Sequence, residues 1–314
     1  MRDIAVFSGS AHPELAISIC RNLGAPLYPA RVRRFANDCI EVQLPANCRE
    51  RDVFLIQPLV PPVQENLMEL LLMLDAARGA SAARITAVLP HFAYARSDKK
   101  DAPRVSIGAR LVADLLVTAG ASRVLTMTLH SPQVHGFFSI PVDHLHARRE
   151  LAAHFAGFDL ANAVVVSPDL GNAKPAAAFA RMLGVPVAAG AKVRLSDDKV
   201  SISDVIGNVA GRDVIVLDDE IAKGTTVLAL LDRLRERGTR SIRIVCTHAL
   251  FAEGVLAKLA GEPDVLEIVC TDTVPIPPER RVPKLQVLSI APALSEAMRR
   301  IHNGESVSAL FAHS

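Results

Sequence analysis

The pattern of apolar and polar positions predicts buried strands that alternate with helices. Residues 214–217 (Val-Ile-Val-Leu) form a continuous run of apolar β-formers, which is typical of a parallel strand buried on both faces. From residue 227 onward, apolar side chains return at helical spacing. The intervening turn is rich in small and hydroxyl residues and opens with two adjacent carboxylates, Asp218 and Asp219. This segment therefore predicts a strand, a polar turn and a helix.

A strand-forming pattern recurs in both halves of the chain. Residues 79–90, 120–130 and 238–248 each open with a glycine that ends a helix, pass a short polar turn and continue as a β-rich run. We therefore expect an α/β fold of two tandem domains, each a mainly parallel sheet flanked by helices. The predicted domains span residues 1–147 and 148–314, and the last ~25 residues are expected to pack back on the first domain. A single domain would require an unusually large sheet.

Composition narrows the class of protein. The net charge is +2, Trp is absent and Tyr occurs twice, so neither charge nor aromatic content indicates a nucleic-acid partner. The five cysteines form no Cys-x-x-Cys pair, which favours a reducing compartment. No signal peptide is evident, and the longest apolar runs, roughly ten residues, are too short to span a bilayer. We therefore expect a cytoplasmic protein that binds neither nucleic acid nor membrane.

The polar turn after residue 217 predicts a phosphate site. Ligands of open α/β sheets bind outside the carboxyl ends of the strands, where the next helix offers unpaired N–H groups to an anion. Gly224, Thr225 and Thr226 would supply backbone and hydroxyl donors to a phosphate, while Asp218 and Asp219 accept hydrogen bonds from sugar hydroxyls. This combination favours a sugar phosphate over a bare nucleotide, and no Walker-type phosphate loop occurs in the chain. An ordinary strand-to-helix turn would also fit the segment taken alone.

Several further segments, in order along the chain, are similar to one family. The turn resembles the ribose-5-phosphate loop of the phosphoribosyltransferase fold. The other similar segments are residues 7–16 (Phe-Ser-Gly-Ser-Ala-His-Pro-Glu-Leu-Ala), 66–76, 94–100 (Tyr-Ala-Arg-Ser-Asp-Lys-Lys), 129–138, 166–171 and 306–311. Together they resemble the ribose-phosphate pyrophosphokinase (PRPP synthetase) family, which transfers the β,γ-diphosphoryl group of ATP to O1 of ribose 5-phosphate.

The resemblance implies a ribose-5-phosphate site and a cationic flap. In the flap, Lys192 and Arg194 correspond to the family's essential Lys and Arg, and on an extended strand both point the same way toward one triphosphate. Without the resemblance, this segment also fits a solvated hairpin with surface charges. The family has a third acid where this chain has Ala222, and Lys223 departs from the family as well. The implied sugar site comprises Asp218, Asp219, Ala222, Lys223, Gly224, Thr225 and Thr226.

The resemblance also implies a Mg²⁺ cofactor and an ATP site. His130 and Asp169 match the family's metal-binding pair, although Thr128 replaces an Asp two residues before the histidine, and a lone His at a strand end is more often structural. The ATP-binding segments depart more, since Asn37, Cys39 and Ser97 replace two acids and a Gln. In the family the first of these segments comes from a neighbouring subunit, so a homo-oligomer (dimer or hexamer) is expected. The implied ATP site comprises Phe35, Asn37, Asp38, Cys39, Arg96, Ser97 and Asp98.

Three functions fit these observations. The first is an active PRPP synthetase with ATP and ribose 5-phosphate as substrates. The second is a phosphoribosyltransferase that consumes PRPP, which shares the acidic loop but does not account for Lys192, Arg194 or Arg96. The third is a non-enzymatic regulatory homologue, which the departures at Asn37, Cys39, Thr128 and Ala222 would favour.

Overall fold

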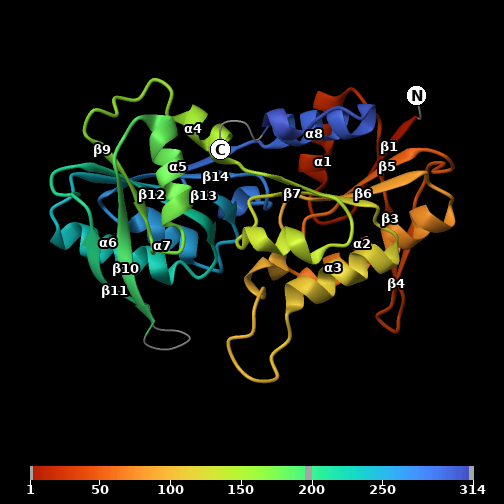
Figure 1. Ribbon diagram of the computed structural model, residues 1–314, viewed down its shortest axis with the longest axis horizontal. Coiled ribbons are helices and arrows are strands. Elements are labelled where there is room, and N and C mark those ends of the chain that lie inside the picture. Colours follow the sequence, from red (N-terminus) through yellow and green to blue (C-terminus); the bar gives the residue numbers. More distant parts are fainter. Residues whose placement is uncertain (1–2, 195–199, 311–314) are drawn as a thin grey trace. The chain divides into compact units, whose positions relative to one another are not determined.

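The computed structural model describes residues 3–194 and 200–310, and side chains at 192–201 and 309 lie outside the described part. These residues form two compact units. The first comprises residues up to 146, residues 273–275 and the segment from residue 289 onward. The second comprises residues 147–272 and 276–288. Each unit is a sheet with helices on both faces (Figure 1), which confirms the α/β architecture predicted from the sequence.

The first unit is built on a six-stranded parallel sheet. Its strands, in spatial order, are β2 (Leu27–Pro29), β1 (Ile4–Ser8), β5 (Asp52–Ile56), β6 (Arg84–Leu89), β7 (Arg123–Met127) and β8 (Val142–Leu145). Helices α2 (Val63–Gly79) and α3 (Gly108–Ala119) cover one face, and α1 (Pro13–Leu23) packs against α8 (Ala291–Asn303) on the other. A separate antiparallel hairpin consists of β3 (Arg31–Arg34) and β4 (Ile40–Gln43).

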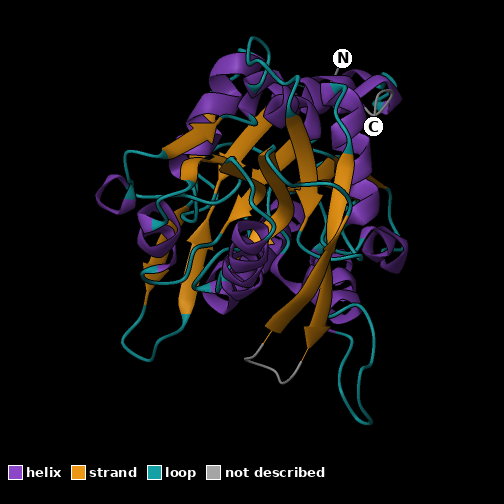
Figure 2. Cartoon of the chain, turned by 90° about the vertical axis from the view of Figure 1, so that its left-hand side faces the viewer, coloured by secondary structure: helices purple, strands orange, loops and turns teal. Residues whose placement is uncertain are grey.

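The second unit is built on a seven-stranded sheet. Its order is β11 (Val200–Ile206), β10 (Val187–Arg194), β9 (Ala163–Ser167), β12 (Asp213–Ile221), β13 (Ser241–Ala249), β14 (Val265–Thr271) and β15 (Leu285–Leu288). Every pair is parallel except β10–β11, the long antiparallel pair at the lower edge of Figure 2. Helices α6 (Thr225–Glu236) and α7 (Val255–Gly261) pack on one face, and α4 (Arg148–His154) and α5 (Ala173–Leu183) lie on the other.

Each unit has its own apolar core. All five residues of β5 and all five of β9 are buried, as expected for central parallel strands that read as continuous apolar runs. Leu70, Met73 and Leu116 from α2 and α3 complete the first core, and Leu230 and Leu259 from α6 and α7 complete the second. Burying one such side chain contributes about 1.5–3 kcal/mol. Packing in the two cores thus fixes the ends of the strands, from which the polar loops emerge.

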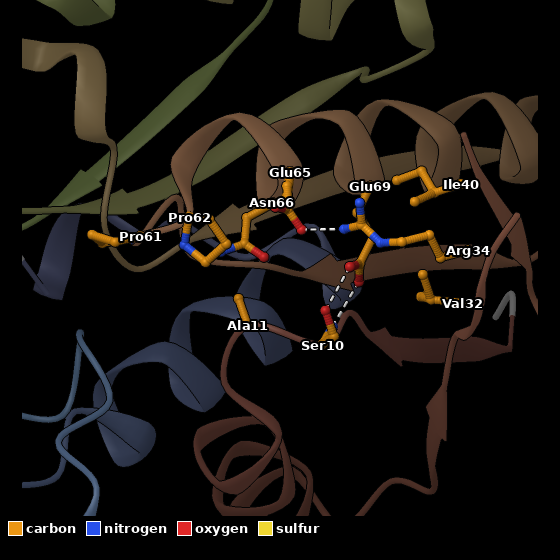
Figure 3. A pocket seen from close by; sticks show the side chains of 10 residues that line it. All are labelled: Ser10, Ala11, Val32, Arg34, Ile40, Pro61, Pro62, Glu65, Asn66 and Glu69. Carbon is orange, nitrogen blue, oxygen red and sulfur yellow. Dashed lines mark hydrogen bonds and ion pairs between the residues drawn. The ribbon is translucent and has the colours of Figure 1, made fainter. Parts of the chain in front are cut away.

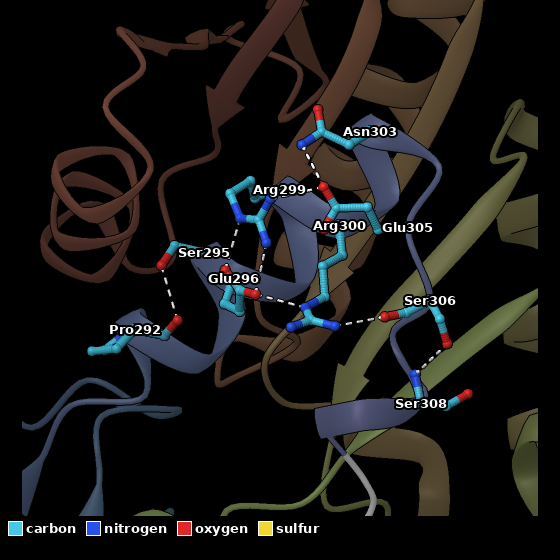
Figure 4. A network of polar contacts seen from close by, with 9 residues as sticks. All are labelled: Pro292, Ser295, Glu296, Arg299, Arg300, Asn303, Glu305, Ser306 and Ser308. Carbon is cyan, nitrogen blue, oxygen red and sulfur yellow. Dashed lines mark hydrogen bonds and ion pairs between the residues drawn. The ribbon is translucent and has the colours of Figure 1, made fainter.

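The segment after residue 289 is held to the first unit by charged groups. Arg84 on β6 forms an ion pair with the fully buried Asp52 on β5 and also donates to the carbonyl oxygens of Ile301 and His302. His302 Nδ1 lies 2.9 Å from Asp52 Oδ2. Within α8, hydrogen bonds from Arg299 and Arg300 lower the pKa of Glu296 to about 2. Arg300 also donates to the carbonyl oxygen of Ser306 (Figure 4).

No helix within the described part of the chain has both the length and the apolar character needed to cross a bilayer.

Candidate active site

Asp218 and Asp219, the paired carboxylates of the second unit, lie on β12 beyond the point where its neighbouring strand β9 ends. The sequence places the strand end at Leu217, but β12 continues to Ile221 because β13 pairs with it as far as Ala249. On the other side, β9 pairs with β12 only up to Val216. Asp218 and Asp219 therefore lie within the strand, half-buried, where β9 no longer covers its edge.

Asp169 belongs to the turn that follows β9. Its backbone carbonyl accepts from Ser167 Oγ at 2.6 Å, and its Oδ1 accepts from the Asn172 N–H at 3.1 Å. The Asn172 side chain in turn donates to the carbonyl oxygen of Leu217 at 3.0 Å, which ties this turn to β12. Burial, then the charge of Asp219 and that of Asp169, raise the pKa of Asp218 well above its usual range. Burial and the neighbouring carboxylates therefore disfavour the ionised form of Asp218.

The N-terminus of α6 follows these acids directly. Gly224 precedes the helix in the left-handed conformation (φ 68°), and no described side chain caps the first turn. An uncapped N-terminus presents backbone N–H groups and the positive end of the helix dipole to an anion. Thr225 is exposed and Thr226 half-buried, so hydroxyl groups are also at hand. This arrangement suits a phosphate group.

The loop before α6 is held by a neighbouring segment. The N–H groups of Phe251 and Ala252 donate to the carbonyl oxygens of Ile221 and Ala222, each at 2.9 Å. A Cβ atom at Gly224 would lie 2.7 Å from Val255 Cγ1, so this position has room only for glycine. Lys223, between these anchors, is exposed. The loop is thus fixed by backbone contacts at Ala222, where the family's acid is missing.

The two candidate catalytic cations belong to β10. The backbone of Lys192 pairs with Ile202 of β11 and that of Arg194 with Val200, after an irregularity between Ala191 and Lys192. Their side chains lie outside the described residues, so their catalytic role stays a prediction.

In the first unit, the Arg96 segment follows β6. Arg96 is exposed at the end of the short helix η1 (Ala93–Arg96). The Ser97 hydroxyl oxygen accepts from the Gly108 N–H at 2.9 Å, which closes the intervening loop at the start of α3. Asp98 Oδ2 accepts from Gln133 Nε2 at 2.7 Å and so links this loop to η2 (Pro132–Phe137), which follows β7. The structure thus joins two loops at the carboxyl ends of adjacent strands.

His130 lies on the same edge but outside the strand. The sequence predicts a strand that runs to His130, whereas β7 ends at Met127 because Thr128 adopts a positive φ of 42°. The next N–H, that of Leu129, donates to His144 Nε2 at 2.8 Å, and His130 itself is exposed. Among the described residues, no group of three His, Cys, Asp or Glu side chains is arranged to hold a metal ion. Metal binding by His130 and Asp169, which lie in different units, stays a prediction.

The remaining ATP-site candidates form the tip of the β3–β4 hairpin. The Phe35 N–H donates to the carbonyl oxygen of Cys39 at 2.8 Å, and Asn37 Oδ1 accepts from the Cys39 N–H at 3.3 Å. Residues 31–39 are all exposed, and Asp38 adopts the left-handed conformation (φ 69°). The tip therefore presents Phe35, Asn37 and Cys39 on an exposed turn.

A pocket of about 360 Å³ lies beside this hairpin and was not foreseen from the sequence (Figure 3). Glu69, a buried residue of its lining, accepts from the N–H and hydroxyl of Ser10 at 2.6 and 2.5 Å. The Ala11 N–H, also in the lining, donates to the Gln57 side chain at 3.0 Å. A Cβ at Gly9 would lie 2.5 Å from Glu69 Oε1, so the close approach requires glycine. Gly9 and Glu69 both fall in segments that carry the family resemblance. These contacts explain why a glycine and a glutamate are needed at the two positions.

The two sheets, each mainly parallel and flanked by helices, define a protein of the phosphoribosyltransferase-like fold. The model of the N-terminal domain of ribose phosphate pyrophosphokinase matches residues 4–120, and that of the phosphoribosyl synthetase-associated domain matches residues 193–312. The chain belongs to the ribose-phosphate pyrophosphokinase family.

Individual relatives are similar to this chain over nearly its whole length. A putative ribose-phosphate pyrophosphokinase of Streptomyces coelicolor is 77% identical over 99% of this chain and 98% of its own length. A ribose-phosphate pyrophosphokinase of Deinococcus radiodurans is 46% identical over 98% of both chains. The crystal structure of phosphoribosylpyrophosphate synthetase from Mycobacterium smegmatis superposes with a TM-score of 0.91 at 39% identity, over 96% of this chain and 100% of that one.

Proposed function

We propose that this chain is a ribose-phosphate diphosphokinase that forms 5-phosphoribosyl 1-diphosphate (PRPP) and AMP from ribose 5-phosphate and ATP. O1 of the sugar attacks the β-phosphorus of ATP, the bond from that phosphorus to the α,β-bridging oxygen breaks, and AMP leaves with the bridging oxygen. The observation that carries the proposal is the acidic edge of β12 beside the uncapped N-terminus of α6. Family membership supports this enzyme over a regulatory homologue or a PRPP-consuming transferase.

The second unit is proposed to hold the sugar phosphate. The N–H groups at the start of α6 and the hydroxyls of Thr225 and Thr226 bind the 5-phosphate, and Asp218 and Asp219 accept hydrogen bonds from the ribose hydroxyls. Backbone N–H donors carry most of the phosphate binding, so Ala222 in place of an acid is compatible with the site. Lys223 lies in the same loop and adds a positive charge near the 5-phosphate.

The first unit is proposed to hold the nucleotide. Arg96, Ser97 and Asp98 form one side of the site. The hairpin turn that carries Phe35, Asn37, Asp38 and Cys39 forms the other side, and in an oligomer it belongs to a neighbouring copy. Lys192 and Arg194 neutralise the charge that develops on the diphosphoryl group during transfer.

A magnesium ion fits the chemistry of the carboxylates beside β12. Burial, and then the charges of Asp219 and Asp169, raise the pKa of Asp218, and a divalent cation nearby would favour its ionised form. Mg²⁺ is commonly bound by one or two carboxylates together with substrate phosphates and water, so it needs no complete protein cage. Asp169 and His130 are the residues proposed to hold it, and when bound it would neutralise charge on the triphosphate.

The test is an assay of purified protein with ribose 5-phosphate, ATP and Mg²⁺ in which AMP and PRPP are measured together. We expect the two products in a one-to-one ratio. Lys192→Ala should lower kcat by about 10²-fold or more, with little change in either KM, because the contact strengthens mainly in the transition state. Near-normal kcat in this variant would remove Lys192 from the mechanism, and absence of PRPP from the wild-type reaction would refute the function.

A further inference from the structure

The hairpin that carries Phe35 needs anchors from the rest of its unit. Its strands β3 and β4 are four residues each and pair only with one another. All four residues of β3 are exposed. A two-stranded ribbon of this size is marginally stable in water without further packing. The orientation of its tip must therefore come from contacts outside the ribbon.

The base of the hairpin has an apolar anchor. Val42 on β4, and Leu44 just after it, pack against the first core, and β4 contacts α2. Ala30, just before β3, also packs against this core, but residues 31–39 are all exposed, so these apolar contacts hold only the base of the hairpin.

The tip has a polar anchor at Arg34. One guanidinium nitrogen pairs with Asp38 in the turn, and the other pairs with Glu65 in the first turn of α2. Figure 3 shows Arg34 crossing the pocket from the hairpin toward Glu65. A planar guanidinium can bridge two carboxylates in a fixed geometry, which a single ammonium does less well. Arg34 thus connects the turn to a helix of the rigid core.

The neighbouring arginine acts on the aromatic ring itself. The Arg33 guanidinium lies 5.0 Å from the centroid of the Phe35 ring, within the range of a cation–π contact. Successive residues of a strand point to opposite sides, so Arg33 and Arg34 act on different sides of the hairpin. The Phe35 ring, which would stack on a purine, is therefore contacted by Arg33, the residue next to Arg34.

We propose that Arg34 is a positioning residue for nucleotide binding, and that Asp38 acts through Arg34 rather than by contacting the nucleotide. The inference rests on the proposed role of the hairpin in the ATP site. The three side chains are about half exposed or more, so these ion pairs contribute little to global stability. Their effect is on the orientation of Phe35, Asn37 and Cys39.

The test compares Arg34→Met, Arg34→Lys, Glu65→Gln and the Arg34→Met/Glu65→Gln double variant. Arg31→Met is the matched control, since Arg31 is exposed on the same strand and forms no ion pair with any residue in the described ranges. We expect Arg34→Met to raise the KM for ATP about fivefold, the equivalent of the upper range for exposed ion pairs. The KM for ribose 5-phosphate should stay within about twofold. Arg34→Lys should fall between wild type and Arg34→Met, and the double variant should match Arg34→Met, because the contact is already lost.

Amide hydrogen exchange over residues 31–43 of the ligand-free protein gives a readout that does not depend on activity. Exchange should be faster in Arg34→Met and Glu65→Gln than in the wild type and in Arg31→Met. Unchanged exchange would contradict the anchor even if the wild-type protein formed no PRPP. Faster exchange with an unchanged KM for ATP in an active enzyme would contradict the role in nucleotide binding.

Discussion

At the scale of single residues, the carboxylate of Asp218 opposes folding when it is ionised. Burial and the charges of Asp219 and Asp169 raise its pKa in the folded protein. The folded state therefore holds this proton to a higher pH than the unfolded state does. Its contribution to stability is complete below the unfolded pKa and is lost as pH rises through the folded value. A cost of this kind is common where groups are arranged for binding rather than for stability.

Replacing Asp218 tests separately its effect on the stability of the fold and its effect on ribose 5-phosphate binding. Asp218→Asn should weaken ribose 5-phosphate by about tenfold or more, the scale of a lost charged hydrogen bond, and leave ATP binding nearly unchanged. It should also raise the unfolding midpoint at neutral pH and flatten its dependence on pH. Calorimetric titration of each ligand and thermal unfolding across pH measure both effects. Asp232→Asn, on the exposed face of α6, is the control. Equal losses for the two ligands would mean that Asp218 binds a shared metal rather than the sugar.

The departures at the hairpin tip predict a broad choice of donor nucleotide. Phe35 offers an aromatic face that any purine can use, whereas discrimination of about 10⁴-fold requires specific buried hydrogen bonds. Asn37 and Cys39 replace two carboxylates of the family, and the Asp38 carboxylate is engaged by Arg34. We expect GTP and dATP to support measurable turnover beside ATP, in rates compared at saturating Mg²⁺. A preference for ATP of about 10⁴-fold would show that other contacts read the base and ribose.

At the scale of elements, the turn between β12 and α6 depends on a glycine that has both a left-handed backbone and no room for a side chain. Gly224→Ala should destabilise the protein by more than the roughly 1–2 kcal/mol of the left-handed conformation alone, because of the contact with Val255, and should weaken ribose 5-phosphate. Gly238→Ala is a matched control with φ +69° and nothing within 4 Å of the added Cβ. Chemical unfolding and ligand titration of both variants measure the difference. Equal costs at the two glycines would contradict the steric part of the argument.

The sequence predicted the kinds of elements better than their ends. Residues 214–217 were predicted as a buried strand from their apolar run, and the helix after residue 224 from its periodicity; both are present. The end of β12 was misplaced because pairing with β13, which is not local, carries the strand through three carboxylates, Asp218, Asp219 and Glu220. The end of β7 was misplaced because the positive φ of Thr128 has no signature in the residue type.

At the scale of the whole molecule, the chain returns to its first unit at its C-terminal end. Arg84 joins Asp52 on β5 to the last turn of α8, across more than 200 residues of sequence. The sequence led us to expect that the last ~25 residues pack back on the first domain, but no local pattern predicts this particular contact of Arg84. The pocket beside the β3–β4 hairpin likewise arises from segments distant in sequence. The candidate chemistry was recognisable from motifs, whereas the groups that position it were not.

The contacts of Arg84 with Asp52 and with the last turn of α8 are expected to stabilise the first unit. Arg84→Met would leave the buried Asp52 with His302 as its remaining ionic partner, so it should lower the free energy of unfolding by about 2–4 kcal/mol. Arg110→Met breaks an exposed pair with Asp114 in the same unit and should cost about 0.5 kcal/mol or less. Denaturant unfolding of both variants provides the comparison. Similar small losses would show that α8 is held by its apolar face alone.

The most direct test of the central claim follows one oxygen atom through the reaction. Ribose 5-phosphate carrying ¹⁸O at O1 is incubated with ATP, Mg²⁺ and the purified protein, and the products are examined by ³¹P NMR and mass spectrometry. Attack of O1 on the β-phosphorus predicts PRPP with the label between C1 and its diphosphate, together with unlabelled AMP. Formation of ADP in place of AMP, or of PRPP that has lost the label, would contradict the proposed transfer.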